Sequence, residues 1–307
     1  MRTAMLGSLE VSVIGLGCNN FGRALDQDGT NGVVAKCLDV GINFFDTASN
    51  YGEAKSEGYL ANALGSHRDE VVIGTKFGLA IPGFEQSGGA RPEYVRAAIE
   101  RSLTQLQTDR IDLFQLHFPD PDTPIAETLG AMNELVAEGK VIEIGCSNLS
   151  AEQMTEAAVE SRGSGVARFV SNQIEYSMVN REVDANGLTD VAMSQDIALL
   201  PYYPLASGLL TGKKRPGQPV EGRLNMERYH RFLTDENYSV ADGLRDFAER
   251  VGQEMSAVAL AWLLAQPTVP SVTPGATKPE QVVSNAKAAD WIPSESELVE
   301  LTGLLDS

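Results

Sequence analysis

GINFFDTASNYG, residues 41–52, is the stretch that decides how the fold is read. Its apolar run, Ile42–Phe45, stops abruptly at an acid, Asp46, and Tyr51 follows five residues later between turn-forming residues. A buried strand that carries a carboxylate and a phenol into the loop at its carboxyl end is a common way for α/β proteins to expose reactive groups. On these residues alone, a strand followed by a helix-capping aspartate and a packed surface tyrosine is an equally good interpretation.

The pattern of a short apolar strand followed by an amphipathic helix extends along the chain from this stretch. Before it, an antiparallel hairpin is predicted over residues 1–13, turning at Gly7 and Ser8, as a flap ahead of the main fold. Eight strands are then predicted, at Val13–Gly17, Ile42–Phe45, Val71–Thr75, Ile111–Leu116, Val141–Gly145, Phe169–Ile174, Ile197–Tyr202 and Val269–Val272.

Helices are predicted between and after these strands, because apolar residues recur there at helical spacing. Two other segments, Cys18–Gly32 and Leu205–Ser239, are predicted as loops, and the length of the second is typical of a functional lid or binding loop. The predicted helices are Val33–Gly41, Glu53–Leu64, Pro92–Leu106, Ile125–Val136, Ala151–Glu160, Glu182–Ser194, Val240–Val251, Ala257–Ala265, Pro279–Ala289 and Glu295–Leu304.

This strict alternation favours a (β/α)8 TIM barrel, in which residues 1–307 form one domain with an N-terminal β-hairpin and a C-terminal extra helix. The strands lack polar alternation, as expected for parallel strands that are buried on both faces. An open dinucleotide-binding sheet is the weaker alternative. Gly15 and Gly17 resemble its GxGxxG fingerprint, but Asn20 stands where the third glycine is needed.

The amino-acid composition limits the classes of binding partner and the cellular compartment that we expect for this protein. The 24 basic residues are outnumbered by 42 acidic ones, and the net charge of −18 argues against a nucleic-acid or anionic-membrane partner. Three cysteines without C-x-x-C spacing indicate reduced thiols. The sequence has no signal peptide and no apolar run of about 18 residues, so we expect a cytoplasmic protein. We expect no metal site.

Four ionisable side chains are expected to meet at the mouth of the barrel. Three consecutive predicted strands end at Asp46, Lys76 and His117, and Tyr51 follows the first of these ends. In a (β/α)8 barrel the carboxyl ends of the strands open into one shared mouth. One polar strand end is unremarkable, but three in succession after apolar runs favour a functional site.

The chemistry of this set is coherent. A phenol, with an ordinary pKa of about 10, is a poor proton donor unless a nearby cation stabilises its phenolate, and Lys76 supplies that cation. Asp46 compensates the buried ammonium, while His117 can donate a hydrogen bond to a substrate carbonyl. These groups are suited to protonating an oxygen on which negative charge develops.

Reduction of a carbonyl also needs a hydride, which no side chain provides, so a nicotinamide cofactor is implied. Ser147, Asn148 and Gln173 lie at later strand ends and suit a carboxamide, and Tyr202 could stack on the nicotinamide ring. Structural alternatives remain open: the first two could cap the helix at Ala151, Gln173 could satisfy backbone groups, and Tyr202 could belong to the core.

At this point the chain resembles the aldo-keto reductase superfamily over nearly its whole length, and in particular its bacterial and channel-β-subunit-like branches. In that family the tyrosine is the proton donor, the lysine and aspartate tune it, and the histidine positions the carbonyl. The resemblance maps these roles onto Tyr51, Lys76, Asp46 and His117. Seven ordered motifs carry it: GINFFDTASNYG, VVIGTKFG (71–78), DLFQLHFPD (112–120), GCSNLS (145–150), SNQIEYS (171–177), PYYPLASGLLTGK (201–213) and PGATKPEQVVSNAKA (274–288).

The resemblance also implies a cofactor extended across the barrel mouth. Ser147, Asn148 and Gln173 would meet the carboxamide, and Tyr202 would stack on the ring. The pyrophosphate and the adenosine phosphate would meet Leu205, Ser207, Leu209, Lys213, Gly275, Thr277, Lys278, Gln281 and Asn285. One branch of the family has lysine and arginine where this chain has Gly275 and Gln281. Lys278 and the adjacent helix start nevertheless favour NADPH (NADP) over NADH.

The expected function is therefore NADPH-dependent, reversible reduction of an aldehyde or ketone to an alcohol. Two alternatives stay open. One is a nicotinamide-binding regulatory subunit with little turnover, and the other is a barrel isomerase or lyase that uses the same four groups. The expected partner is a small-molecule carbonyl substrate, whose identity the sequence leaves undetermined, as it does the oligomeric state.

Overall fold

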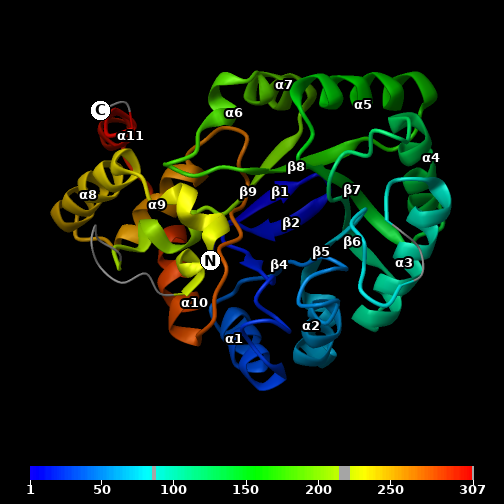
Figure 1. Cartoon of the computed structure of the whole chain (residues 1–307), viewed down its shortest axis with the longest axis horizontal. Coiled ribbons are helices and arrows are strands. Elements are labelled where there is room, and N and C mark those ends of the chain that lie inside the picture. Colours follow the sequence, from blue (N-terminus) through cyan, green and yellow to red (C-terminus); the bar gives the residue numbers. More distant parts are fainter. Residues whose placement is uncertain (85–87, 214–221, 306–307) are drawn as a thin grey trace.

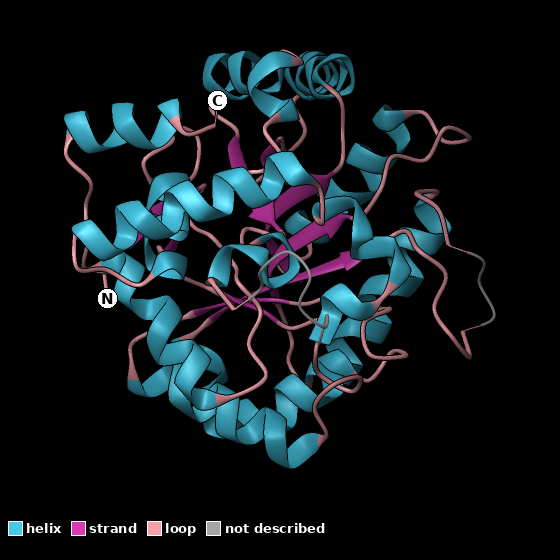
Figure 2. Cartoon of the chain, turned by 60° about the vertical axis from the view of Figure 1, so that its left-hand side comes forward, coloured by secondary structure: helices cyan, strands magenta, loops and turns pink. Residues whose placement is uncertain are grey.

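A curled sheet of seven parallel strands forms the centre of the molecule, in a computed structural model that describes residues 1–84, 88–213 and 222–305. Helices surround this sheet (Figure 1; Figure 2). The strands follow one another in chain order, so each is hydrogen-bonded to the next along the sequence. They are β3 (Leu16–Gly17), β4 (Phe44–Asp46), β5 (Val72–Phe77), β6 (Ile111–Leu116), β7 (Val141–Ser147), β8 (Phe169–Glu175) and β9 (Ala198–Tyr202).

The eighth predicted strand, Val269–Val272, is an extended segment joined to its neighbours by isolated bridges. On one side, the Leu199 N–H of β9 donates to the Thr268 carbonyl at 2.7 Å. On the other side, Val272 and Gly275 form parallel bridges with Ile14 and Gly17. This segment joins the two edges of the sheet, and the (β/α)8 barrel is confirmed.

The N-terminal hairpin, β1 (Thr3–Leu6) and β2 (Leu9–Ser12), pairs antiparallel as predicted. It is a plug and not a flap: Leu6, Leu9 and Val11 are buried in one apolar cluster with inward-facing residues of the strands. Figure 1 shows both hairpin strands near the middle of the ring. The hairpin therefore closes the barrel at the amino ends of the strands, and the mouth at their carboxyl ends remains for other groups.

Two helix boundaries near the predicted site differ from expectation. Helix α1 (Gln27–Asp39) begins inside the predicted loop Cys18–Gly32, because the side chain of Asp26 caps it by accepting from the Gly29 N–H. Helix α2 (Ser56–Leu64) begins three residues later than predicted. The backbone from Gly52 to Ala54 has φ between 57° and 69°, which an α-helix cannot accommodate.

The predicted helix Glu182–Ser194 is two helices, because Gly187 between them adopts φ 81°. Of the predicted loop 205–239, residues 214–221 lie outside the described ranges, and the described remainder forms 3₁₀ turns and the start of α8, which Thr234 caps. The other helices lie close to their predicted positions. The bounds are α3 (Pro92–Leu106), α4 (Ile125–Ala137), α5 (Ala151–Ser164), α6 (Glu182–Ala185), α7 (Leu188–Gln195), α8 (Asp235–Arg250), α9 (Met255–Leu264), α10 (Pro279–Ala286) and α11 (Glu295–Gly303), with 3₁₀ turns η1 (Gly65–Glu70), η2 (Ala206–Thr211), η3 (Gly222–Asn225), η4 (Glu227–Phe232) and η5 (Lys287–Ala289).

Within the described ranges, every helix falls short of the length and apolarity that a membrane crossing requires. The three cysteines, all of them described, are buried and form no disulfide. Burial alone raises the pKa of the Cys37 thiol to about 12, which makes this thiol a packing group.

Candidate active site

A buried ion pair lies at the carboxyl ends of β4 and β5. The Lys76 ammonium is 2.7 Å and 2.8 Å from the two carboxylate oxygens of Asp46, and it also donates to the Thr47 carbonyl at 2.8 Å. The Lys76 side chain is fully buried, and that of Asp46 is 7% exposed. Asp46 is therefore the partner of Lys76 and does not cap a helix. Helix α2 begins after Lys55 and has no side-chain cap.

Tyr51 and His117 lie beside this pair. The Lys76 nitrogen is 5.1 Å from the centroid of the Tyr51 ring, and the His117 ring meets that ring edge-on at 5.7 Å between centroids. The side chain of His117 extends from the residue directly after β6, and Phe118 stacks on it at 5.4 Å. The structure thus brings Tyr51 together with the three side chains expected at consecutive strand ends.

Burial and the charge of Lys76 determine how these groups titrate. Burial raises the pKa of the Tyr51 phenol, and the Lys76 ammonium counteracts part of that rise. Burial also lowers the pKa of His117, and the nearby charge of Lys76 lowers it further, to about 3. For Lys76 itself, burial opposes the charged form, but Asp46 and Tyr51 together raise its pKa. At neutral pH the site therefore holds a protonated phenol, a neutral imidazole and an ammonium.

Gln115 was not among the residues predicted from the sequence, and its side-chain nitrogen lies 3.4 Å from a carboxylate oxygen of Asp46. Gln115 is fully buried and lies one residue before the end of β6. The available signal was that Gln115 is an uncharged polar residue close to the carboxyl end of a mostly apolar strand. It supplies a further hydrogen-bonding group to the carboxylate that holds Lys76.

The next strand ends form a second group of polar side chains. The Asn148 amide donates to the His117 carbonyl at 3.0 Å, and the Tyr202 hydroxyl donates to the Asn148 side-chain oxygen at 2.9 Å. The Ser147 hydroxyl donates to the Gln173 carbonyl at 2.8 Å. Ser147 and Asn148 do not cap α5, because Ser150 does so in a capping box with Gln153. The hydrogen bonds link the end of β7 with His117 on one side and with β8 and β9 on the other.

Among the described residues, four polar side-chain atoms near this end of the barrel are buried without a hydrogen-bond partner: Asn50 Oδ1, Gln115 Oε1, Gln173 Nε2 and Ser207 Oγ. A buried polar group without a partner costs free energy, so such groups commonly mark places where a ligand binds. Of these, the Gln173 nitrogen near the end of β8 and the Ser207 hydroxyl in the loop after β9 fit the carboxamide and phosphate ends of a nicotinamide nucleotide.

The loop after β9 has an unusual backbone. Tyr203, Ala206 and Ser207 all have φ between 46° and 56°, which is uncommon for residues other than glycine. Leu205 is half-buried and Leu209 is fully buried, so the side chain of Leu209 cannot line a binding surface. Only its backbone could contact a phosphate.

Lys213, at the far end of that loop, is exposed and lies close enough to Glu254 to help lower the pKa of that carboxyl, behind hydrogen bonds from Lys287 and Ser284. Lys287 and Ser284 belong to the region of α10 and η5. Lys213 therefore lies toward α10, where the adenosine end of a cofactor was expected.

The residues expected at the adenosine end gather around the start of α10. Gly275 pairs with Gly17 of β3, and Lys278 is the exposed residue that precedes the first turn of α10. The Gln281 side-chain oxygen accepts from both the N–H and the hydroxyl of Thr277, at 2.7 Å and 3.1 Å. This side chain is therefore folded back over the helix start. Asn285, one turn later, is 6% exposed.

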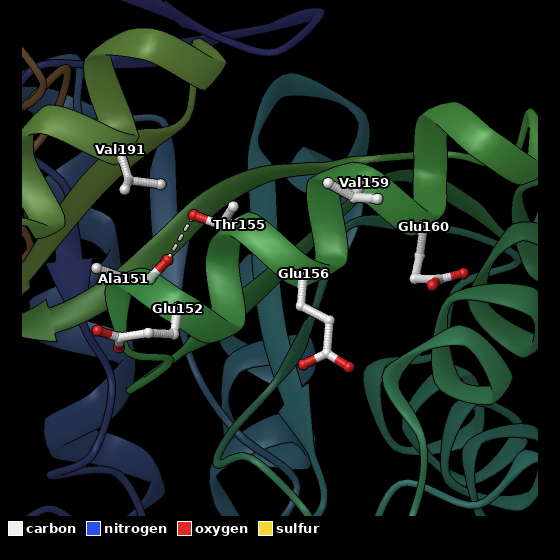
Figure 3. Close-up of a pocket in the computed structure, with 7 residues that line it drawn as sticks. All are labelled: Ala151, Glu152, Thr155, Glu156, Val159, Glu160 and Val191. Atoms are coloured by element: carbon white, nitrogen blue, oxygen red, sulfur yellow. Dashed lines mark hydrogen bonds between the residues drawn. The ribbon is translucent and has the colours of Figure 1, made fainter.

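A surface hollow lies outside this mouth. It has a cavity volume of about 580 Å³ and runs along α5 beside Val191 of α7 (Figure 3). Three of its lining residues are glutamates on α5, and its floor is shallow and open. It shares no lining residue with the site described above.

Comparison with known proteins places these observations in context. Residues 13–305 match the model of the Aldo/keto reductase family. A probable voltage-gated potassium channel subunit beta of Oryza sativa is 34% identical over 89% of this chain and 85% of its own length. The L-glyceraldehyde 3-phosphate reductase of Escherichia coli O157:H7 is 33% identical over 91% of this chain and 84% of its own. An aldo-keto reductase of Bacillus subtilis is 32% identical over 97% of this chain and 91% of its own.

Proposed function

This chain belongs to the aldo/keto reductase family, and we propose that it reduces an aldehyde or ketone with NADPH. Its reductase relatives support the assignment as an oxidoreductase that acts on carbonyl groups. The observation that carries the proposal is the position of Lys76, paired with Asp46 and directed at the ring of Tyr51. This arrangement supplies a proton to an oxygen on which negative charge develops.

In the proposed reaction, bound NADPH supplies the hydride that reaches the carbonyl carbon. The neutral ring of His117 donates a hydrogen bond to the carbonyl oxygen and orients it toward the Tyr51 hydroxyl. Tyr51 then gives its proton to that oxygen. The Lys76 ammonium stabilises the phenolate left behind, and Asp46 keeps the buried ammonium charged.

The proposed cofactor contacts use the polar atoms at the mouth. Gln173, with Ser147 and Asn148, would hold the carboxamide, and Tyr202 would pack on the ring. Ser207 and the backbone of residues 205–209 would meet the pyrophosphate. At the other end, Lys278 lies exposed at the start of α10, where a lysine and the helix N-terminus together favour a phosphate. NADPH is proposed over NADH for this reason.

Substitution Y51F tests the proposal. The variant keeps the ring and removes only the hydroxyl, so the fold and cofactor binding should persist while NADPH oxidation with a good carbonyl substrate falls by more than about 100-fold. Retention of activity within about tenfold, equivalent to ~1.4 kcal/mol of barrier, would show that another group donates the proton.

A second candidate is a regulatory subunit that binds the nucleotide with negligible turnover. Two relatives that are probable voltage-gated potassium channel beta subunits, each 34% identical to this chain, favour it. Steady-state turnover of the unmodified protein on a panel of aldehydes and ketones, beside calorimetric NADPH binding, separates the two. Tight binding without turnover on any member of the panel supports the regulatory subunit.

A further inference from the structure

The loop that carries Tyr51 accepts hydrogen bonds from the side chain of Arg101, a residue of helix α3. Arg101 donates through Nη1 to the Ser49 carbonyl at 3.5 Å and through Nη2 to the Ala54 carbonyl at 3.3 Å. These carbonyls lie two residues before and three residues after Tyr51. One guanidinium therefore spans the turn from which the phenol extends.

This turn needs such support because its backbone is strained. Gly52, Glu53 and Ala54 have consecutive φ values of 58°, 57° and 69°, and the last two are not glycine. Conformations of this kind cost free energy and persist only where the surrounding structure fixes them. Arg101 binds the carbonyl of the last strained residue, Ala54.

The same guanidinium is linked to the strand that carries Lys76. Its Nη1 lies 3.0 Å from the carboxylate of Glu57 on α2, and the other oxygen of that carboxylate accepts from the Thr75 hydroxyl at 2.8 Å. Thr75 directly precedes Lys76 in β5. The Glu57 side chain is 1% exposed and that of Arg101 is 16% exposed, so little water competes for these bonds.

We propose that Arg101 is a positioning residue for the reaction, which holds the Tyr51 side chain in place relative to Lys76. It does so through its hydrogen bonds to Glu57 and to the carbonyls of Ser49 and Ala54. This inference rests on the proposed role of Tyr51. Arg101 contacts neither the phenol nor Lys76 in any hydrogen bond of the described structure, so it acts through the backbone. Lysine cannot replace it, because one ammonium does not present the planar fork that reaches three acceptors.

The test compares R101K with the double variant E57Q/R101M. The first keeps the charge and loses the fork, and the second removes both charges, so that no unpaired carboxylate stays buried. R96M is the matched control, because Arg96 lies on the same helix but is 45% exposed and pairs with surface glutamates. We expect kcat to fall by about 10- to 100-fold in both test variants. We expect the NADPH Kd of both to stay within about twofold of the value for the unmodified protein.

A second readout is independent of catalysis. The amides of Tyr51, Lys55 and Ser56 donate to Ala48 and Tyr51 carbonyls within the turn, so hydrogen–deuterium exchange there reports its order. Exchange about tenfold faster at these amides, and unchanged elsewhere in the chain, supports the proposal. Unchanged exchange and kcat in R101K, or exchange accelerated equally throughout the protein, overturns it. If the unmodified protein shows no turnover, the proposed function fails, and exchange alone then decides whether Arg101 holds the turn.

Discussion

Lys76 and Asp46 form a bidentate ion pair, in which the ammonium lies 2.7 Å and 2.8 Å from the two carboxylate oxygens and both side chains are almost fully removed from water. Removing charges from water is expensive, and a pair of this kind persists only when its geometry and remaining hydrogen bonds are good. Here the Thr47 carbonyl and the Gln115 amide provide those additional bonds.

Substitution D46N should therefore weaken both activity and stability. The ammonium of Lys76 would lose its counter-charge, so the unfolding free energy should fall by about 3 kcal/mol at pH 7, as for other broken buried pairs. The folded pKa of Lys76 is raised, so the pair stabilises the protein fully below the ordinary lysine value of about 10.4, and this stabilisation is lost as pH rises through the folded value. Urea unfolding of both proteins from pH 7 to 11 measures it. Parallel stability curves up to pH 11 would contradict the raised pKa.

His117 should make stability fall in acid. Its folded pKa is lowered to about 3 by burial and by Lys76, whereas the unfolded chain takes up the proton near the ordinary value of about 6.5. Stability from the neutral imidazole is therefore present above about pH 6.5 and is lost as pH falls toward 3, by about 1.4 kcal/mol per pH unit. Urea unfolding at pH 7, 5.5 and 4.5 checks this against H117Q. The glutamine variant lacks this contribution, and equal pH slopes in both proteins would count against it.

Gly52 should not tolerate even a methyl group. A Cβ there would lie 1.9 Å from the Phe21 carbonyl oxygen, a backbone atom, and φ is already 58°. Substitution G52A should lower the unfolding free energy by more than about 2 kcal/mol and reduce kcat, because the adjacent Tyr51 must move. The control G165A meets no atom within 4 Å at φ 67° and isolates the cost of positive φ, about 1 kcal/mol. Denaturation and turnover of the two variants give the comparison, and similar losses in both would argue against the clash.

Ser207 should matter for the nucleotide and not for the fold. Its hydroxyl is buried without a partner, so S207A should leave the free protein equally or slightly more stable while weakening NADPH binding about 3- to 10-fold. Ser171, whose hydroxyl is also buried without a partner but lies inside the barrel against Gly145, provides the control S171A. Calorimetric titration with NADPH measures both. Equal affinity in S207A and the unmodified protein would remove Ser207 from the cofactor site.

Much of this architecture could be predicted from the amino-acid sequence. Parallel strands buried on both faces are rich in apolar residues, so a charged or polar residue that follows such a run stands out, as Asp46, Lys76 and His117 do. Because all carboxyl ends of a barrel share one mouth, three such ends predict one site before any distance is known. The barrel itself and the hairpin pairing followed from the same periodicity.

Some helix and strand boundaries could not be predicted, because they depend on backbone conformation and on contacts between distant segments. The delayed start of α2 depends on three consecutive positive φ values at Gly52, Glu53 and Ala54, in a turn whose Ala54 carbonyl accepts a hydrogen bond from the distant Arg101. The eighth predicted strand forms isolated bridges, of Val272 with Ile14 and of Gly275 with Gly17 of β3, and local propensity does not predict such pairing with a distant segment.

The residue types and their order along the chain were thus enough to choose the barrel and to bring Asp46, Tyr51, Lys76 and His117 to one mouth, since strand ends are a property of periodicity. Tertiary structure alone decided that Lys76 reaches both carboxylate oxygens of Asp46 and the Thr47 carbonyl, that the hairpin plugs the barrel, and that Gln115 and Arg101 form hydrogen bonds beside the site. Each of these depends on contacts between segments far apart in the sequence, whose distances and burial only the folded chain defines.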